Sequence, residues 1–325
     1  MKAKRKKRYS KAFTILPVTA SWAKRVGRLQ ASLARGHGTE LSYLLANCDA
    51  VYRTVDGRGS DSDAAHPSAG ARITFNMPSV HVPGFCAATM AGKTNAYKNC
   101  YDIAHEATAS SIKTQISERR KLVDNALPLP IDASVSTTYF GAVDVNGTGV
   151  RFYGDVCLVL KRDEATACVV LDRNSYDLVR SPVKEVIAQV PDKAQHEARQ
   201  TIARSWSGSW HGDLQYIVAM KSLAILSLNK RRWTAGQISH AVCSDEDYIE
   251  VLKCGSFNAR DLQEARLDAN DVGEDALTAS RMRSRSPVPR LESMLLARRR
   301  ARAEIALRFL RVPVRIVGTH GRTKG

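Results

Sequence analysis

The stretch STTYFGAVDVNGTGVRFYGDVCLVLK, residues 136–161, decides the fold class of this chain. Its two ends, 136–145 and 152–161, are rich in β-branched and aromatic residues, and NGTG lies between them. Asn-Gly is typical of tight hairpin turns because both central residues of such a turn need a positive φ. We therefore predict two antiparallel strands here and a third strand in ACVVLD, residues 167–172, which together would form a meander.

Helical periodicity predominates on both sides of this strand-rich stretch. Apolar side chains recur every three to four residues over 20–52, where RGHG separates two helices, and again over 96–122 and 192–230. The segment RLESMLLARRRARAEIALRFL, residues 290–310, reads as a further helix, and VPVRIVG after it as a last strand.

Shorter segments complete the predicted elements. ARITFNMP at 71–78 and YIEVLKCG at 248–255 are predicted strands, and HVPGFCAATMAGKTN at 81–95 is a predicted loop. NARDLQEARL at 258–267 is predicted to be a helix because Asn258 can cap its first turn. The predicted fold class is α+β, with a small mixed or antiparallel sheet flanked by helices, a helical N-terminal region, and a basic C-terminal helix and strand.

Composition divides the chain into five segments. Small, polar and breaker residues gather in DGRGSDSDAAHPSAG, and the two prolines of ALPLPID mark a boundary near residue 128. We predict a basic helical N-terminal segment (1–55), a linker loop (56–70), a helical connecting region (71–128), an α+β domain expected to hold any catalytic site (129–280), and a basic C-terminal helix and strand (281–325).

The formal net charge of +17 is concentrated at the two ends of the chain. Residues 1–35 carry 11 Lys or Arg and no acidic residue, and residues 281–325 carry 13 Lys or Arg against 2 Glu, so each end has a charge of +11. Clustered cations favour RNA or DNA because neutralised phosphates release counterions, although a solvated basic tail is the alternative. The candidate nucleic-acid-binding residues are Lys4, Arg5, Lys6, Lys7, Arg8, Arg298, Arg299, Arg300 and Arg302.

Several function classes are not expected from this sequence. The seven cysteines include no CxxC pair, and no His-x-x-x-His occurs, so we predict a reducing, cytoplasmic location and no metal site. No run of about 18 apolar residues is present, so no membrane span is expected. AGKT at 91–94 has Ala87 where a phosphate-binding loop needs its first glycine, which argues against an NTPase.

Glu250 is the most conspicuous candidate for chemistry. It lies in a predicted strand between Ile249 and Val251, so if these two face the core, the carboxylate faces the opposite side. Two interpretations remain open: an ordinary outward carboxylate, or one held rigidly at the rim of a cleft, where it would stabilise a developing positive charge.

The succession YFGAVDV, VRFYGDVCLVLK, DRNSYDLV and YIEVLKCGSFNARDLQEARL resembles the late portion of mono-ADP-ribosyltransferase-like domains, over about residues 135–270. The resemblance implies cleavage of the nicotinamide–ribose bond of NAD and transfer of ADP-ribose to protein, nucleic acid or a small acceptor, or simple NAD glycohydrolysis. Tyr248 stands where the family often has Gln or Glu. A non-catalytic nucleic-acid-binding protein that uses its basic ends is the alternative, and a structural protein of a phage or mobile element is also compatible with the composition.

The resemblance also implies roles for single residues. Glu250 takes the place of the catalytic glutamate, which hydrogen-bonds the ribose and stabilises the oxocarbenium-like transition state. The other implied NAD-binding residues are Ser175 on or after the serine strand, Tyr176 stacked on nicotinamide, Arg151 or Tyr139 as the first-strand residue that grips NAD, and Arg173 at the pyrophosphate.

Overall fold

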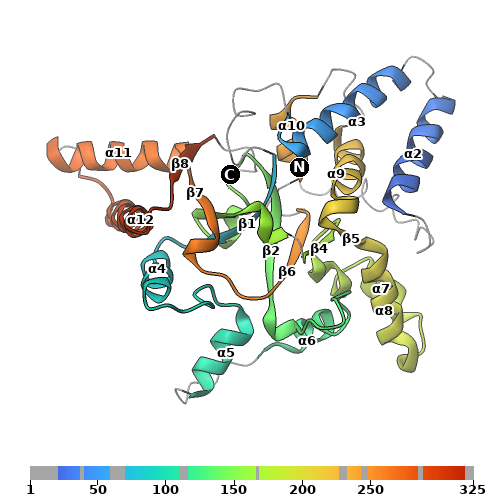
Figure 1. Ribbon diagram of the computed structural model, residues 1–325, viewed down its shortest axis with the longest axis horizontal. Helices are drawn as coiled ribbons and strands as arrows, with labels where there is room; N and C mark the ends of the chain where they lie inside the picture. The colour runs from blue at the N-terminus through green and yellow to red at the C-terminus, as the bar shows by residue number, and fades with distance from the viewer. Residues whose placement is uncertain are drawn as a thin grey trace.

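The structure is a computed structural model, and it describes residues 21–36, 40–58, 70–109, 116–165, 168–226, 233–242, 248–284 and 288–318. One eight-stranded sheet with the order β5-β4-β6-β2-β1-β3-β7-β8 forms the centre of the molecule (Figure 1). Its strands are β1 (Ala71–Met77), β2 (Thr138–Val145), β3 (Val156–Leu160), β4 (Cys168–Leu171), β5 (Ser207–Ser209), β6 (Glu250–Cys254), β7 (Leu262–Asp268) and β8 (Val314–Val317). All neighbouring pairs are antiparallel except β7 with β8, so the sheet is mixed.

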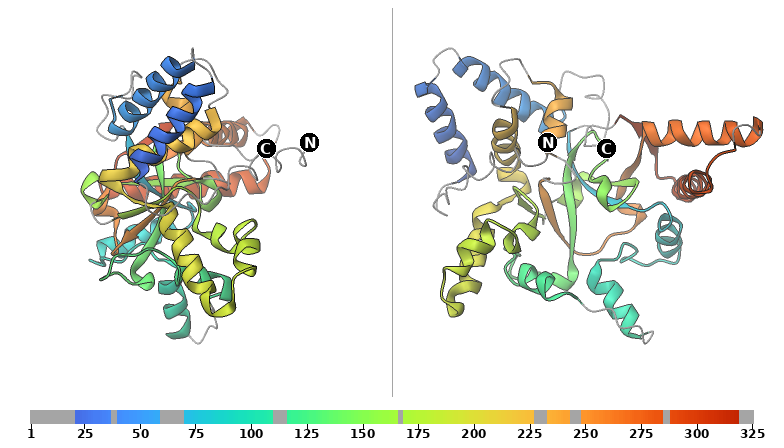
Figure 2. Two further views of the ribbon diagram at one scale, coloured as in Figure 1. Left: turned by 90° about the vertical axis from the view of Figure 1, so that its right-hand side faces the viewer. Right: turned by 180° about the vertical axis from the view of Figure 1, so that it is seen from behind.

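Helices surround this sheet, which confirms the α+β class. They are α2 (Trp22–Gly36), α3 (Glu40–Asp56), α4 (Val82–Met90), α5 (Cys100–Ala109), α6 (Glu118–Asp124), α7 (Val183–Ala188), α8 (Asp192–Trp206), α9 (Trp210–Leu226), α10 (Ala235–Val242), α11 (Ala269–Ser284) and α12 (Leu291–Phe309). Helices α2, α3, α9 and α10 gather at one end of the molecule, and α11 and α12 project at the other (Figures 1 and 2). Within the described residues, no helix combines the length and the apolar character needed to cross a bilayer.

The two faces of the sheet differ sharply in chemistry. Paired residues on neighbouring strands share a face, so Ile73, Phe75 and Val143 lie on one side with the main hydrophobic core. The opposite side of the central strands carries polar residues that are nevertheless buried: Arg72, Thr74, Asn76, Asp144, Glu250, Glu264, Arg266 and Asp268. A buried polar face needs internal partners, and it is the place where chemistry can be built.

The predicted meander is wrong, because β1 lies between β2 and β3. Asn146 and Gly149 do adopt positive φ angles of 62° and 66°, but the chain then makes a further turn at 151–153 instead of closing a hairpin. Asn76 of β1 donates hydrogen bonds to the carbonyls of Thr148 and Gly154, at 2.9 and 3.0 Å. The NGTG loop therefore wraps around the end of a strand that comes from far away in the sequence.

Three other local predictions are corrected by the structure. Residues 82–90 form helix α4, and Pro83 sits in its first turn, where a missing N–H is tolerated. Asn258 caps only a short 3₁₀ turn, after which 262–268 becomes strand β7, with Glu264 and Arg266 on the polar face. The single helix predicted over 96–122 consists of the two helices α5 and α6.

The sheet crosses the predicted segment boundaries. Strand β1 belongs to the segment 71–128 and β8 to the segment 281–325, yet both pair with strands of the segment 129–280. The main core likewise extends from Trp22 to Val312. The region 59–69 of the predicted linker lies outside the described residues.

Candidate functional site

A pocket of about 1000 Å³ opens where strands β1 and β2 separate. Their pairing covers only Ala71–Thr74 with Ala142–Val145; beyond it β1 pairs with β3 and β2 pairs with β6. The pocket is lined from the polar face by Thr74, Asn76, Phe140, Ala142, Val150, Tyr153, Tyr176, Tyr248, Glu250 and Arg120, and from the side of α4 and α5 by residues that include Phe85, Tyr97, Lys93, Lys98 and His81. The fork between the two strands thus creates an aromatic-walled site next to Glu250.

The carboxylate of Glu250 is fixed at the start of β6. Only 3 % of the residue is exposed, and the backbone N–H of Ser175 donates to its Oε2 at 2.8 Å. The register places Glu250 between Ala142 of β2 and Leu171 of β4. Val251 faces the hydrophobic core, so the alternation predicted from the sequence is confirmed, but the carboxylate is buried and not an ordinary outward one.

Burial raises the pKa of Glu250 to about 7, because a carboxylate loses water stabilisation when it is enclosed by protein. The hydrogen bonding of Ser175 and the charge of Arg120 oppose this rise. The group therefore changes charge near neutral pH, as groups at catalytic sites often do.

A chain of hydroxyl groups extends from Glu250 along the pocket wall. The Tyr248 hydroxyl donates to Glu250 Oε1 at 3.4 Å and lies 3.0 Å from the Tyr153 hydroxyl. The side-chain amide of Asn174 donates to the same Tyr248 oxygen at 3.2 Å, and its carbonyl oxygen accepts from the Tyr176 N–H at 2.9 Å. This network ties the DRNSYD turn, residues 172–177, to the strand that carries Glu250.

Arg120 on α6 brings a guanidinium group into the lining of the pocket. Its Nε donates to Asp124 at 2.8 Å, and its guanidinium lies 3.8 Å from the centre of the Phe140 ring and 5.6 Å from that of Tyr176. The Nη2 atom is buried and has no hydrogen-bond partner among the described residues. Ser117 caps α6 by accepting from the Arg120 N–H at 3.2 Å, which sets the position of this helix. A guanidinium in a pocket wall with one unused donor is suited to an anionic ligand group.

The structure brings part of the predicted site together. Glu250 and Tyr176 both line the pocket, and Ser175 reaches Glu250 through its backbone N–H. The Ser175 side chain is fully buried.

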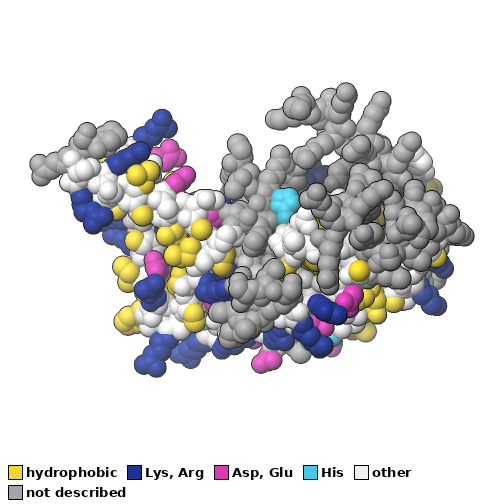
Figure 3. Space-filling view, turned by 90° about the horizontal axis from the view of Figure 1, so that it is seen from above, with side chains coloured by type: hydrophobic (Ala, Val, Ile, Leu, Met, Phe, Trp, Pro, Cys, Tyr) yellow, Lys and Arg dark blue, Asp and Glu magenta, His cyan; other side chains and the backbone are white. Residues whose placement is uncertain are grey.

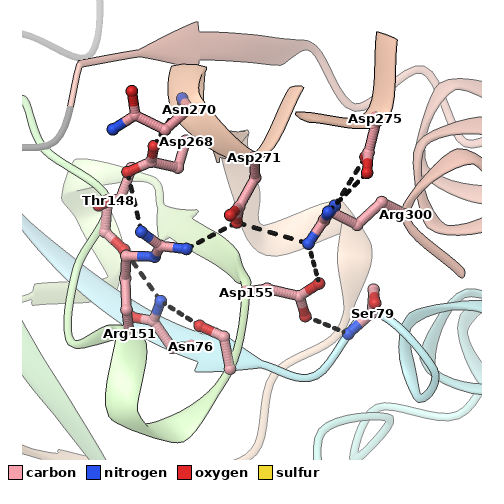
Figure 4. A network of polar contacts seen from close by, with 11 residues as sticks. Asn76, Ser79, Thr148, Arg151, Asp155, Asp268, Asn270, Asp271, Asp275 and Arg300 are labelled. Carbon is pink, nitrogen blue, oxygen red and sulfur yellow. Dashed lines mark hydrogen bonds and ion pairs between the residues drawn. The ribbon is translucent and has the colours of Figure 1, made fainter. Parts of the chain in front are cut away.

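Arg151 is not at this site. Its guanidinium pairs with Asp268 at 3.2 Å and with Asp271 at 2.7 Å, and this ion-pair network continues through Arg300 (Figure 4). It fixes the turn 151–153, whose Tyr153 lines the pocket. Arg151 is thus a structural residue. The arginine that lines the pocket is Arg120, which was not predicted from the sequence.

Arg173 and Tyr139 are also engaged outside the pocket lining. Arg173 makes two hydrogen bonds of 2.8 Å to Asp172, and its guanidinium lies 4.7 Å from the Trp206 ring. The Tyr139 hydroxyl donates to Asp102 at 3.1 Å, and its ring packs in the main core. Neither residue is placed to grip a ligand beside Glu250.

The predicted nucleic-acid-binding residues fall into three groups. Residues 4–8 lie outside the described residues. Arg298, Arg299 and Arg302 are exposed on α12. Arg300 is only 7 % exposed and pairs with Asp155, Asp271 and Asp275, so its charge is already neutralised within the protein.

Sequence reasoning missed Arg120, Tyr153 and the hydroxyl of Tyr248. A usable signal for Arg120 existed, since SERRKLVD combines a capping serine with an Arg-x-x-x-Asp pair at helical spacing. Nothing in the sequence places Tyr153 beside Tyr248, because the two come together only through β1 and β2. A scan against protein-family models and a search of curated proteins found no match to this chain.

Proposed function

We propose that the pocket binds NAD and cleaves its nicotinamide–ribose bond, passing ADP-ribose to an acceptor or to water. The observation that carries the proposal is Glu250, a carboxylate held by a backbone N–H, largely sealed from solvent and facing a pocket with aromatic walls. A fixed negative charge in such a site stabilises the positive charge that develops at ribose C1′ as the bond breaks. The family resemblance of residues 135–270 supports the same reaction.

The proposed step needs no oxidant or metal ion. The C1′–N bond breaks with its electron pair leaving on nicotinamide, which becomes neutral. The ionised Glu250 carboxylate stabilises the positive charge at C1′, and the acceptor then bonds to C1′ and releases its proton. Because only the ionised form of Glu250 can do this, its pKa of about 7 makes the reaction sensitive to pH near neutrality.

The other residues of the pocket fit a dinucleotide. The pocket volume of about 1000 Å³ lies at the upper end of the range of about 300–1000 Å³ for ligand pockets. Arg120 has a buried donor free for a phosphate oxygen, and the ring of Tyr176 offers a surface on which a base or nicotinamide stacks. Lys93 and Lys98 at the α4–α5 side add positive charge.

Nicotinamide release by the purified full-length chain tests the proposal. We expect release by wild type, and a loss of about 10²- to 10³-fold in Glu250→Gln, because the amide keeps the shape of the side chain and removes its charge. Glu118→Gln changes a carboxylate that is 84 % exposed on α6, and this control should leave the rate unchanged.

Arg120→Gln separates binding from chemistry. We expect it to raise the KM for NAD much more than it lowers kcat, since the phosphates contact Arg120 in the ground state and in the transition state alike. Absence of nicotinamide release from folded wild-type chain, with and without RNA, DNA or protein acceptors, would reject the proposed function.

A further inference from the structure

A second concavity lies between α4 and α12, and its lining is less polar than that of the pocket beside Glu250. It has a volume of about 650 Å³ and is lined by Ser79, Val80, Pro83, Cys86, Met90, Arg299, Arg302, Ile305, Ala306 and Phe309. Helices α4 and α12 lie side by side in both the front and the back view (Figures 1 and 2). We call this concavity the α4–α12 groove.

The walls of the groove are two helical stripes. On α12 the lining residues Arg299, Arg302, Ala306 and Phe309 recur at intervals of three and four, which puts them on one face over about 15 Å of helix. Pro83, Cys86 and Met90 form the corresponding stripe of α4. Side chains spaced in this way leave a groove into which the ridge of a third helix packs.

Four of the apolar side chains that line the groove are largely exposed to solvent. Phe309 is 74 % exposed, Ile305 68 %, Met90 52 % and Val80 50 %. Isolated apolar side chains on a surface are ordinary, but four around one concavity form a patch of the kind that binds another protein. Figure 3 shows hydrophobic and Lys or Arg side chains next to one another at the α11–α12 end of the molecule.

Positive charge marks the other end of the α12 stripe. Arg299 and Arg302 both line the groove, and neither forms an ion pair among the described residues. Their neighbour Arg300 points into the protein and pairs with Asp155, Asp271 and Asp275 (Figure 4). Arg300 therefore has a structural role, whereas Arg299 and Arg302 face the groove. The two ends of this chain, 1–20 and 319–325, carry 9 basic residues and no acidic one, and like charge disfavours their docking here.

We propose that the α4–α12 groove binds an acidic amphipathic helix of another protein. About three turns of helix match the length of the α12 stripe; apolar side chains would cover Ile305 and Phe309, and carboxylates would pair with Arg299 and Arg302. A nucleic acid fits less well, because the exposed aliphatic side chains offer nothing to phosphates. This surface is separate from the Glu250 pocket and does not depend on the function proposed for it.

A fluorescent peptide of about 18 residues tests this, with Leu at helical spacing on one face and Glu elsewhere, titrated with the full-length chain and followed by anisotropy. The matched peptide has Lys in place of every Glu. We expect the Glu peptide to bind at least about tenfold more tightly than the Lys peptide. Phe309→Ser and Arg302→Glu should each weaken its binding by at least about tenfold, because one removes apolar contact and the other reverses a charge.

Arg298→Glu is the control, since it reverses an exposed charge on α12 that does not line the groove. It should leave the affinity for the Glu peptide unchanged, and all three variants should keep the urea midpoint of wild type. Equal affinity for the two peptides, or binding of the Glu peptide that survives both groove substitutions, overturns the proposal. An oligouridylate probe whose binding is lost in Arg302→Glu and retained in Phe309→Ser, with no binding of the Glu peptide, would identify a phosphate-binding surface instead.

Discussion

Replacing Glu250 with glutamine should change how the stability of this protein depends on pH. The pKa of this carboxyl is raised by burial from its ordinary value of 4.5 to about 7. The folded protein therefore holds a proton that the unfolded chain has already lost between these two values, and stability falls as pH rises through that interval. At about 1.4 kcal/mol per pKa unit, the loss reaches about 3 kcal/mol above pH 7.

The assay is urea unfolding of wild type and Glu250→Gln at about pH 5 and about pH 8. Glutamine does not titrate, so its fixed effects on packing and hydrogen bonding cancel when the two pH values are compared. We expect the free energy of unfolding of wild type, relative to Glu250→Gln, to fall by about 2 to 3 kcal/mol between the two conditions, because part of the loss has already occurred at pH 5.

The neighbouring substitution Ile249→Val serves as the control. It removes one methylene group from a fully buried, non-titrating side chain and should cost about 1 kcal/mol at both pH values. A wild-type to Glu250→Gln difference that stays constant with pH would mean that Glu250 titrates at its ordinary value in the folded protein. The burial argument, and the pH-sensitive site built on it, would then fail.

Three further predictions concern Glu250, a close backbone contact at Gly154 and the ion pairs of Arg300. Nicotinamide release should increase with pH with a midpoint near 7, because the ionised carboxylate of Glu250 is the active form, and a flat profile between about pH 5.5 and 8.5 would contradict this. Gly154→Ala should lower the free energy of unfolding by at least about 2 kcal/mol, because the Cβ of the new alanine would lie 2.1 Å from the carbonyl carbon of Met77. The control is Gly273→Ala on α11, whose Cβ meets no atom within 4 Å and which should be neutral or stabilising. Arg300→Ala should cost about 3 kcal/mol in urea unfolding because it leaves three carboxylates without their shared partner, and Arg298→Ala should stay within about 0.5 kcal/mol; equal effects of the two would refute the distinction between a structural and a free arginine.

Local pattern was enough to predict many elements of this fold. The apolar periodicity of 20–52, 192–230 and 290–310 marks real helices, and the strands at β1, β2, β3, β4, β6 and β8 follow from alternation or from runs of β-branched residues. The fold class α+β is therefore readable from the sequence alone.

Strand order could not be read in the same way. The Asn-Gly turn after β2 satisfies the local rule for a hairpin, with Asn146 at positive φ, yet β1 lies between β2 and β3, the two strands on either side of the turn. Asn76 makes this insertion favourable by donating to the loop carbonyls of Thr148 and Gly154, a contact between residues more than 70 positions apart. Short-range patterns contain no information on such contacts.

The candidate site shows the same division. Alternation around Glu250 correctly puts this residue on the side of β6 opposite the core, and the turn with Ser175 and Tyr176 reaches it. The arginines assigned from the sequence were misplaced, because residue type says nothing about which carboxylates surround a guanidinium. Arg151 has two carboxylate partners of its own, whereas Arg120 keeps a buried donor unused.

Two buried charged residues on the polar face of this sheet, Arg266 and Glu250, differ in whether an ion pair neutralises them. Arg266 is fully buried and pairs with Glu264 at 2.6 Å and with Asp144 at 3.5 Å, so positive and negative charge meet within one closed cluster. Glu250 is equally enclosed but forms no ion pair among the described residues, and its pKa rises accordingly. A protein that needed only a stable core at this position would use an apolar residue or a paired carboxylate, since an unpaired one costs about 3 kcal/mol above pH 7. A carboxylate without an ion-pair partner among the described residues, placed where the strands separate around a pocket, is consistent with a charge kept available for a ligand.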